Sequence, residues 1–174
     1  MKSIFLISIF TLLLVGNINN TNASQDELDM QLSDLKNYQV NSPKMLSAGL
    51  PTQKHFETLK KMGVTKVIDL IPGDRSEEVN LMKELGLSYH NIQVEWENPT
   101  IENFNEYVSF MDKYNITEGK TLTHCRLNWR GAAFTYLYRV TQLNEPEELA
   151  KQDMLEIWQP NETWQAFIDE VIAK

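Results

Sequence analysis

A strand pattern, a cysteine-containing loop and a helix pattern follow one another closely, and this succession constrains the fold more than any other feature. KTLTH, residues 120–124, has the β-branched residues of a short strand, and GAAFTYLYRVTQL, residues 131–143, has the small and apolar residues of a buried helix. Between them lies Cys125, the only cysteine of the chain. A strand that leads through a short loop into a helix is typical of α/β proteins.

The rest of the chain repeats this alternation of strand and helix patterns. Strand patterns occupy 64–71 and 87–94, and helix patterns occupy 25–38, 55–62, 76–85, 101–114, 147–158 and 162–173. There is no internal repeat, and no linker is long enough to divide the chain. We therefore expect one three-layer α/β domain, with a small central sheet of about four or five mostly parallel strands flanked by helices.

The first residues have the layout of a secretory signal peptide. Lys2 precedes a largely apolar run over 4–15, and Ala23 ends a polar stretch with a plausible cleavage site. The run is shorter than the roughly 20 residues that cross a bilayer. We expect a signal peptide over 1–23 and a mature domain over 24–174, secreted or periplasmic and without stable membrane insertion after cleavage.

Charge and cysteine usage narrow the possible functions. Residues 24–174 carry 15 basic against 24 acidic side chains. A balance this acidic argues against nucleic-acid binding through a general basic field, and we expect no such partner. One cysteine cannot form an internal disulfide, so Cys125 would be a free thiol in an oxidising compartment. Cys125 is either a reactive group or a buried residue that only packs in the core.

The neighbours of Cys125 favour a reactive group. Amides at a helix N-terminus lack intrahelical partners and attract anions, and the same field stabilises thiolate over thiol. Arg130 adds a permanently charged, planar donor that suits phosphate or sulfur oxyanions. A nucleophile and an anion cradle would then come from one loop.

Two segments resemble the cysteine-dependent protein tyrosine and dual-specificity phosphatases. HCRLNWRGAAF is similar to their phosphate-binding loop, and LSAGLPTQKHFETLKKMGVTKVIDLIPGDR is similar to a segment of the bacterial members. The resemblance covers about 45–140. It implies a phosphate ester or phosphoprotein substrate, with Cys125 as nucleophile and Arg130 as phosphate ligand. The substrate-binding loop would comprise Arg126, Leu127, Asn128, Trp129 and Gly131.

The loop departs from the family pattern in three ways. Four residues separate Cys125 from Arg130 where the family has five, so the ring of amides is tighter. Asn128 replaces the usual glycine, although asparagine also tolerates a left-handed backbone. Gly131 replaces the hydroxyl residue that helps the thiolate leave. Turnover of phosphate is therefore expected to be slow, or the site only binds.

Two alternatives remain open. Rhodanese-like sulfurtransferases often have Cys-Arg-x-Gly-x-Arg, which 125–130 match except at the glycine, and they would use a persulfide on Cys125. Against the sulfurtransferase alternative, a histidine directly before the cysteine favours the phosphatase interpretation. We expect this residue, His124, to order the loop. The other alternative is a non-catalytic module that binds oxyanions or phosphoproteins in the same cradle.

A phosphatase of this type also needs a general acid for the leaving group. The resemblance places it on a loop some thirty residues before the cysteine, where Glu95 and Glu97 stand, with Asp74 as a weaker reserve. Trp129 would either line the pocket or pack over the loop. Three scattered histidines and one cysteine give no metal-ligand spacing, so we expect no metal and no cofactor.

Overall fold

The structure, a computed structural model, describes residues 26–113 and 119–174, and the expected signal peptide lies outside them. Its centre is a five-stranded sheet with the strand order β1-β2-β5-β3-β4. Only β1 is antiparallel to its neighbour. The strands are β1 (Gln39–Ser42), β2 (Met45–Ala48), β3 (Val64–Asp69), β4 (Ser88–Asn91) and β5 (Lys120–His124).

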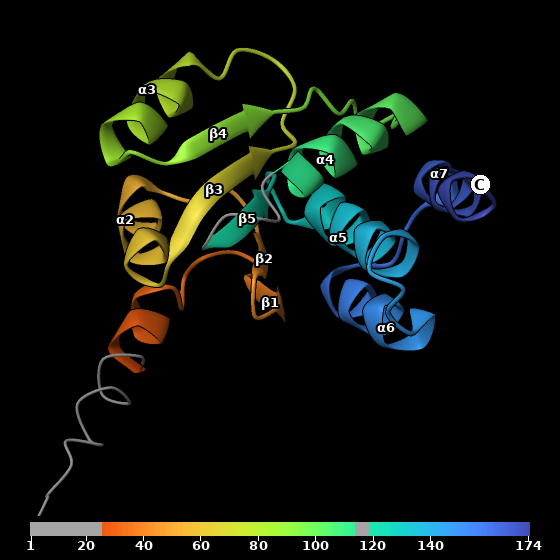
Figure 1. The fold of residues 1–174 in the computed structure, drawn as a ribbon, viewed down its shortest axis with the longest axis horizontal. Coiled ribbons are helices and arrows are strands. Elements are labelled where there is room, and N and C mark those ends of the chain that lie inside the picture. Colours follow the sequence, from red (N-terminus) through yellow and green to blue (C-terminus); the bar gives the residue numbers. More distant parts are fainter. Residues whose placement is uncertain (1–25, 114–118) are drawn as a thin grey trace, which may run out of the picture.

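Helices cover both faces of this sheet, so the expected three-layer α/β domain with a mostly parallel sheet is confirmed (Figure 1). One face packs against α2 and α3, and the other packs against α4 and α5, with α6 and α7 beside α5. The helices are α2 (Gln53–Lys61), α3 (Ser76–Leu85), α4 (Ile101–Lys113), α5 (Trp129–Thr141), α6 (Glu147–Ile157) and α7 (Glu162–Ile172).

The position of β5 determines where a ligand can bind. It lies between β2 and β3, and its Leu122 is completely buried. The helix α2 joins β2 to β3 over one face of the sheet, and α4 joins β4 to β5 over the other face. The connections around β5 therefore run over opposite faces. In open parallel sheets, ligands bind beyond the carboxyl ends of the strands at such a point. Cys125 directly follows the carboxyl end of β5.

The N-terminal part of the described chain differs from the sequence-based expectation. A helix was expected over 25–38, but only 26–31 are helical and turns follow. The extended segment after it forms the hairpin of β1 and β2, in which Pro43 and Lys44 make the connection. Leu32 and Leu35 are buried against the α2 side of the sheet. Their burial therefore does not require the continuous helix that the spacing of the leucines predicted.

Strand β4 also ends earlier than its apolar pattern predicted. The side chain of Asn91 donates hydrogen bonds to the backbone oxygens of Asp69, at 3.0 Å, and Ile71, at 2.9 Å. Together with the bond from the Ile92 amide to the Asp69 carbonyl, at 2.9 Å, they lie where the strand ends and the loop that carries Glu95 and Glu97 begins.

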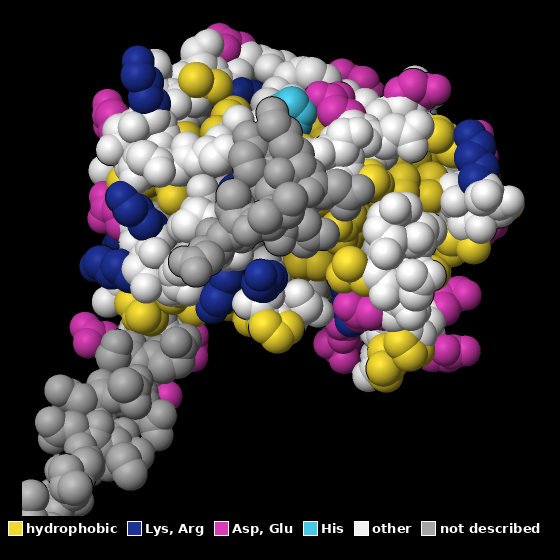
Figure 2. All heavy atoms as spheres, viewed as in Figure 1, with side chains coloured by type: hydrophobic (Ala, Val, Ile, Leu, Met, Phe, Trp, Pro, Cys, Tyr) yellow, Lys and Arg dark blue, Asp and Glu magenta, His cyan; other side chains and the backbone are white. Residues whose placement is uncertain are grey.

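None of the helices within 26–113 and 119–174 is both long enough and apolar enough to span a membrane. On the face shown in Figure 2, acidic side chains are spread around the periphery, while lysine and arginine side chains lie singly or in small groups. This distribution fits the acidic composition.

Candidate active site

The cysteine loop is held in place by backbone contacts with the end of β2. The amide of Cys125 donates to the carbonyl of Ala48 at 3.2 Å, and the amide of Leu50 donates to the carbonyl of Arg126 at 3.2 Å. The side-chain amide of Asn37 donates to the carbonyl of Leu127 at 2.8 Å. The loop is therefore tied along its length to segments far away in the sequence.

Asn128 closes the loop and begins α5 with a left-handed backbone (φ 63°), which confirms that asparagine adopts this conformation here. Its buried side chain donates to the backbone oxygen of Asn37 at 2.8 Å and to the hydroxyl of Ser47 at 2.9 Å. A Cβ on Gly131 would lie 2.3 Å from Oδ1 of Asn128. The fixed Asn128 side chain thus explains why glycine stands where related loops have a hydroxyl residue.

Arg130 lies in the first turn of α5 and is 8% exposed. Its Nε donates to the carbonyl of Val94 at 2.9 Å, and its guanidinium carbon lies 5.3 Å from the centroid of the Trp96 ring. Among the described residues, its two Nη atoms have no hydrogen-bond partner. The single Nε bond orients the group and leaves its two-pronged end available for an oxyanion.

Cys125 and Arg130 line one pocket of about 300 Å³, together with Trp96, Arg126, Leu127 and Trp129. Cys125 itself is 1% exposed, so only a molecule that enters the pocket reaches the thiol. Arg126 and Leu127 are exposed at its edge. Asn128 and Gly131 are not among the residues that line the pocket, and the expectation that they bind substrate, here through backbone amides, stays a prediction.

All four tryptophans of the chain gather beside this pocket. Trp129 and Trp158 are stacked with ring centroids 5.5 Å apart, and Trp96 contacts the other three rings. Trp164 is completely buried, and its Nε1 donates to the carbonyl of Trp96 at 2.9 Å. Trp129 therefore lines the pocket and also packs against the rings of Trp96 and Trp158. No local sequence pattern predicted the part of Trp158, which follows α6, or of Trp164, which lies in α7.

The acid candidates lie on either side of Trp96 in the loop after β4. Glu95 and Glu97 are both exposed and are not among the residues that line the pocket. The bond from Trp164 to the Trp96 carbonyl restrains this loop beside the pocket mouth. The assignment of Glu95 or Glu97 as the general acid therefore stays a prediction.

The reserve acid Asp74 instead has a structural contact. Its Oδ1 accepts from the backbone amide of Ser76 at 2.9 Å, and it also contacts the Ser76 hydroxyl. These hydrogen bonds from Ser76, first from the side chain and then from the backbone, lower the pKa of Asp74. A carboxyl held as the anion is a poor proton donor near neutral pH.

A buried polar network lies beneath the cysteine loop, and sequence reasoning did not find it. Asp69 accepts from Nε of Arg75 at 2.6 Å and from the Tyr89 hydroxyl at 2.8 Å, while Arg75 also pairs with Glu78. Nε2 of His124 lies 2.8 Å from Oε1 of Glu78, and neither atom has a hydrogen-bond partner of suitable geometry among the described residues. His124 is completely buried, and its neighbours fix the residue before Cys125.

The network shifts the ionisation of its members. Burial would lower the pKa of Arg75, but its hydrogen bond to Asp69 and the charges of Asp69 and Glu78 outweigh that effect and raise it. Burial, followed by the charge of Asp69, raises the pKa of Tyr89. Arg75 thus stays a cation and Tyr89 a neutral donor, which keeps the carboxylate of Asp69 compensated.

Asp69, Glu78 and His124 also place three possible metal-ligand atoms within 4.8 Å of one another. However, Arg75 already binds one oxygen of each carboxylate. A divalent cation would have to share these carboxylates with a buried guanidinium, which is unfavourable. We interpret the group as an ion-pair network.

Replacing Glu78 with Gln is expected to lower the free energy of unfolding by about 1–3 kcal/mol, because the amide removes one of the two carboxylates that Arg75 binds and the carboxylate that lies beside His124. Glu77, an exposed neighbour on α3, provides the matched control, and Glu77→Gln should change stability by less than about 0.5 kcal/mol. Urea unfolding of both variants measures the difference. Equal effects would show that the Glu78 contacts do not stabilise the fold.

No model of a protein family and no curated protein sequence matches the chain. Several solved structures, in contrast, match it. A candidate phosphatase of the DUF442 family from Shewanella putrefaciens CN-32 is 33% identical, with a TM-score of 0.73, over 83% of this chain and 96% of that one. The chain belongs to this DUF442 family. A second structure with the same description is 31% identical, with a TM-score of 0.69, over 91% of this chain and 98% of that one.

More distant structures share the fold of this DUF442 protein. The core catalytic domain of the PP-IP phosphatase SIW14 from S. cerevisiae has a TM-score of 0.66 at 18% identity, over 78% of this chain and 85% of that one. P. aeruginosa TpbA has a TM-score of 0.61 at 18% identity, over 79% and 88%. Together with the 33% identical candidate phosphatase, these folds confirm the resemblance to cysteine-dependent phosphatases of the protein tyrosine and dual-specificity type. The candidate phosphatase favours this interpretation over the sulfurtransferase alternative.

Proposed function

We propose that the protein is a cysteine-dependent phosphatase that hydrolyses phosphate monoesters through a phosphocysteine intermediate. One observation carries this proposal: the thiol of Cys125 and the free guanidinium end of Arg130 line the same pocket, beyond the carboxyl end of the central strand. Family membership and the phosphatase-type neighbours support it.

In this mechanism, the Cys125 thiolate attacks phosphorus, and a sulfur–phosphorus bond forms as the bond to the leaving oxygen breaks. Arg130 and the amides at the start of α5 hold the remaining phosphate oxygens, whose charge they compensate. Glu95 or Glu97 protonates the leaving oxygen. The same carboxylate then takes a proton from the water that attacks phosphorus, which releases phosphate and restores the thiolate.

The pocket wall supports a preference for aromatic or apolar phosphate esters. Two indole rings, those of Trp96 and Trp129, and the side chain of Leu127 line the pocket, whereas Arg126 and Arg130 are the only cations that do so among the residues that the structure describes. Glu95 and Glu97 add negative charge nearby. A polyanionic ester would need more cations than this wall offers. P. aeruginosa TpbA, which shares the fold, was solved in complex with pTyr.

Phosphate release from p-nitrophenyl phosphate tests the reaction class. We expect turnover that vanadate or tungstate inhibits and that is faster than for an alkyl phosphate of similar size. Protection of Cys125 from alkylation by phosphate without any turnover would instead support the oxyanion-binding module. A persulfide formed from thiosulfate, without phosphate release, would support the sulfurtransferase.

For the general acid, we expect that Gln at either Glu95 or Glu97 slows hydrolysis of an alkyl phosphate by about 10²-fold or more, because a poor leaving group needs the proton. The same change should affect p-nitrophenyl phosphate far less, since that leaving group departs without protonation. Steady-state rates of both single variants and the double variant on the two esters distinguish the candidates. Unchanged rates in all three would exclude both carboxylates.

We also propose that the mature protein is exported to the periplasm or secreted. The proposal rests on Lys2, the short apolar run over 4–15 and the cleavage pattern at Ala23. N-terminal sequencing of the exported protein is expected to begin near Ser24. Exported protein that retains Lys2 would contradict cleavage.

A further inference from the structure

The segment before β1 lies against the cysteine loop, although 90 positions separate Asn37 from Leu127 in the sequence. The side-chain amide of Asn37 donates to the Leu127 carbonyl at 2.8 Å, and the side-chain amide of Asn128 donates back to the Asn37 carbonyl at 2.8 Å. Both asparagines have a left-handed backbone, with φ 49° at Asn37 and φ 63° at Asn128. Each asparagine therefore binds the segment that carries the other.

Gly49, directly after β2, is enclosed by the same two segments. Its amide donates to the carbonyl of Lys36 at 2.6 Å, and it forms an isolated antiparallel bridge with Leu127. A Cβ on Gly49 would lie 2.9 Å from the Lys36 carbonyl oxygen and 3.0 Å from the Arg126 carbonyl oxygen. Only glycine leaves room for both segments to approach the end of β2 this closely.

These contacts fix the point at which the loop turns into α5. Asn128 is completely buried, and its left-handed backbone begins the helix. Its side chain is held by the Asn37 carbonyl and, at 2.9 Å, by the Ser47 hydroxyl, while the carbonyl that precedes it is held by the Asn37 side chain. A peptide unit is planar, so an anchored carbonyl also sets the direction of the N–H that follows it. The amides of Trp129 and Arg130 come next, and their directions depend on this turn.

We propose that Asn37 is a positioning residue for the phosphate-binding loop. It holds the turn at Asn128 and thereby directs the amides at the start of α5 toward the bound oxyanion. Asn37 does not line the pocket of Cys125, so it acts only through the loop. This inference rests on the proposed function, because the geometry of the loop matters to activity only if the loop binds phosphate.

Asn37→Asp gives the sharpest test. The two side chains have the same shape and both tolerate a left-handed backbone, but a carboxylate cannot donate to the Leu127 carbonyl and would repel it. We expect kcat/KM for p-nitrophenyl phosphate and the affinity for vanadate to fall about 10- to 100-fold, the range from one lost hydrogen bond to a displaced binding group. Asn37→Gly removes the donor without adding a charge, so its loss should be smaller, about 3- to 10-fold.

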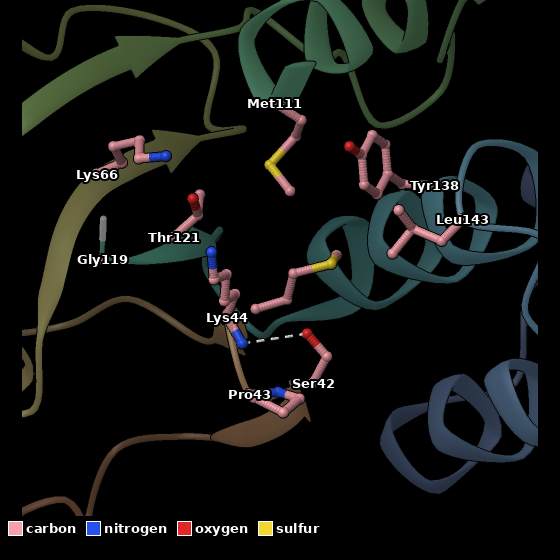
Figure 3. Close-up of a pocket in the computed structure, with 10 residues that line it drawn as sticks. Ser42, Pro43, Lys44, Lys66, Met111, Gly119, Thr121, Tyr138 and Leu143 are labelled. Atoms are coloured by element: carbon pink, nitrogen blue, oxygen red, sulfur yellow. Dashed lines mark hydrogen bonds between the residues drawn. The ribbon is translucent and has the colours of Figure 1, made fainter. Parts of the chain in front are cut away.

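Asn144 provides the matched control, because it is an exposed asparagine with the same left-handed backbone (φ 54°). The preceding Leu143 lines a second pocket, of about 290 Å³, together with Thr121 near the amino end of β5 (Figure 3). Cys125 instead follows the carboxyl end of β5. Asn144→Asp adds the same charge at this distant place and should keep kcat/KM and vanadate affinity within about twofold of the wild type, because distant exposed charges are screened.

Thermal unfolding of all variants separates positioning from stability. A merely structural role for Asn37 would lower the unfolding temperature but leave kcat/KM and vanadate affinity, measured well below that temperature, equal to those of Asn144→Asp. That result would overturn the inference, and so would an equally large loss in Asn144→Asp. If Asn37→Asp is too unstable to assay, Asn37→Gly decides by the same criteria.

Protection of Cys125 from alkylation by vanadate keeps this inference distinct from the proposed function. If the wild type binds vanadate but releases no phosphate, the proposed reaction fails, whereas weaker protection in Asn37→Asp still supports the inference. If the wild type releases phosphate and Asn37→Asp matches it, the proposed reaction stands and the inference fails. A wild type that neither binds vanadate nor releases phosphate would contradict both.

Discussion

Replacing Cys125 with Ser is expected to lower kcat for p-nitrophenyl phosphate by a factor on the order of 10⁴ to 10⁶, the size of effect seen when an enzyme loses its nucleophile. A serine hydroxyl in the same buried position is a far weaker nucleophile, and no second cysteine in the chain can replace it. Steady-state phosphate release measures the loss.

The fold should survive this change, because serine and cysteine are similar in size and Cys125 makes its hydrogen bond through the backbone. Thermal unfolding of the variant provides the control for structure. A folded variant that retains more than about a tenth of the wild-type rate would show that Cys125 is not the nucleophile.

The second large effect is expected at Arg130. Replacing it with Lys keeps the charge but removes the Nε bond to the Val94 carbonyl and the two-pronged donor. We expect kcat/KM to fall by about 10²- to 10³-fold, the usual cost of one preorganised donor to a developing oxyanion. Inhibition by vanadate should weaken as well.

Arg126 provides the matched control for Arg130. It carries the same charge in the same loop but is exposed at the pocket edge. Arg126→Lys should change kcat/KM by less than about tenfold, as is usual for an exposed charge. If both variants retain activity and vanadate inhibition, Arg130 does not bind the phosphate.

The sequence predicted the centre of the site because the necessary features are local. The strand, the cysteine, the arginine and the start of the helix all lie within 120–141, so the spacing alone brings Cys125 and Arg130 to one end of the sheet. The left-handed Asn128 was predictable for the same reason, since the conformation depends on the residue itself.

The surroundings of the site could not be predicted because they depend on contacts between distant segments. Glu78 reaches His124 from α3, and Trp164 reaches the Trp96 carbonyl from α7, across 68 positions of sequence. Neither contact has a local pattern. Likewise, Leu32 and Leu35 fit a helical spacing, but they lie in a turn segment whose packing against the sheet buries them.

Trapping of the intermediate tests the central claim most directly. Wild-type protein is mixed with a radiolabelled aryl phosphate, quenched in acid during turnover, digested and sequenced by mass spectrometry. The mechanism predicts phosphate bound covalently to the sulfur of Cys125, and none in Cys125→Ser. Turnover without any phosphorylated Cys125, or label on another residue, would contradict a phosphocysteine mechanism.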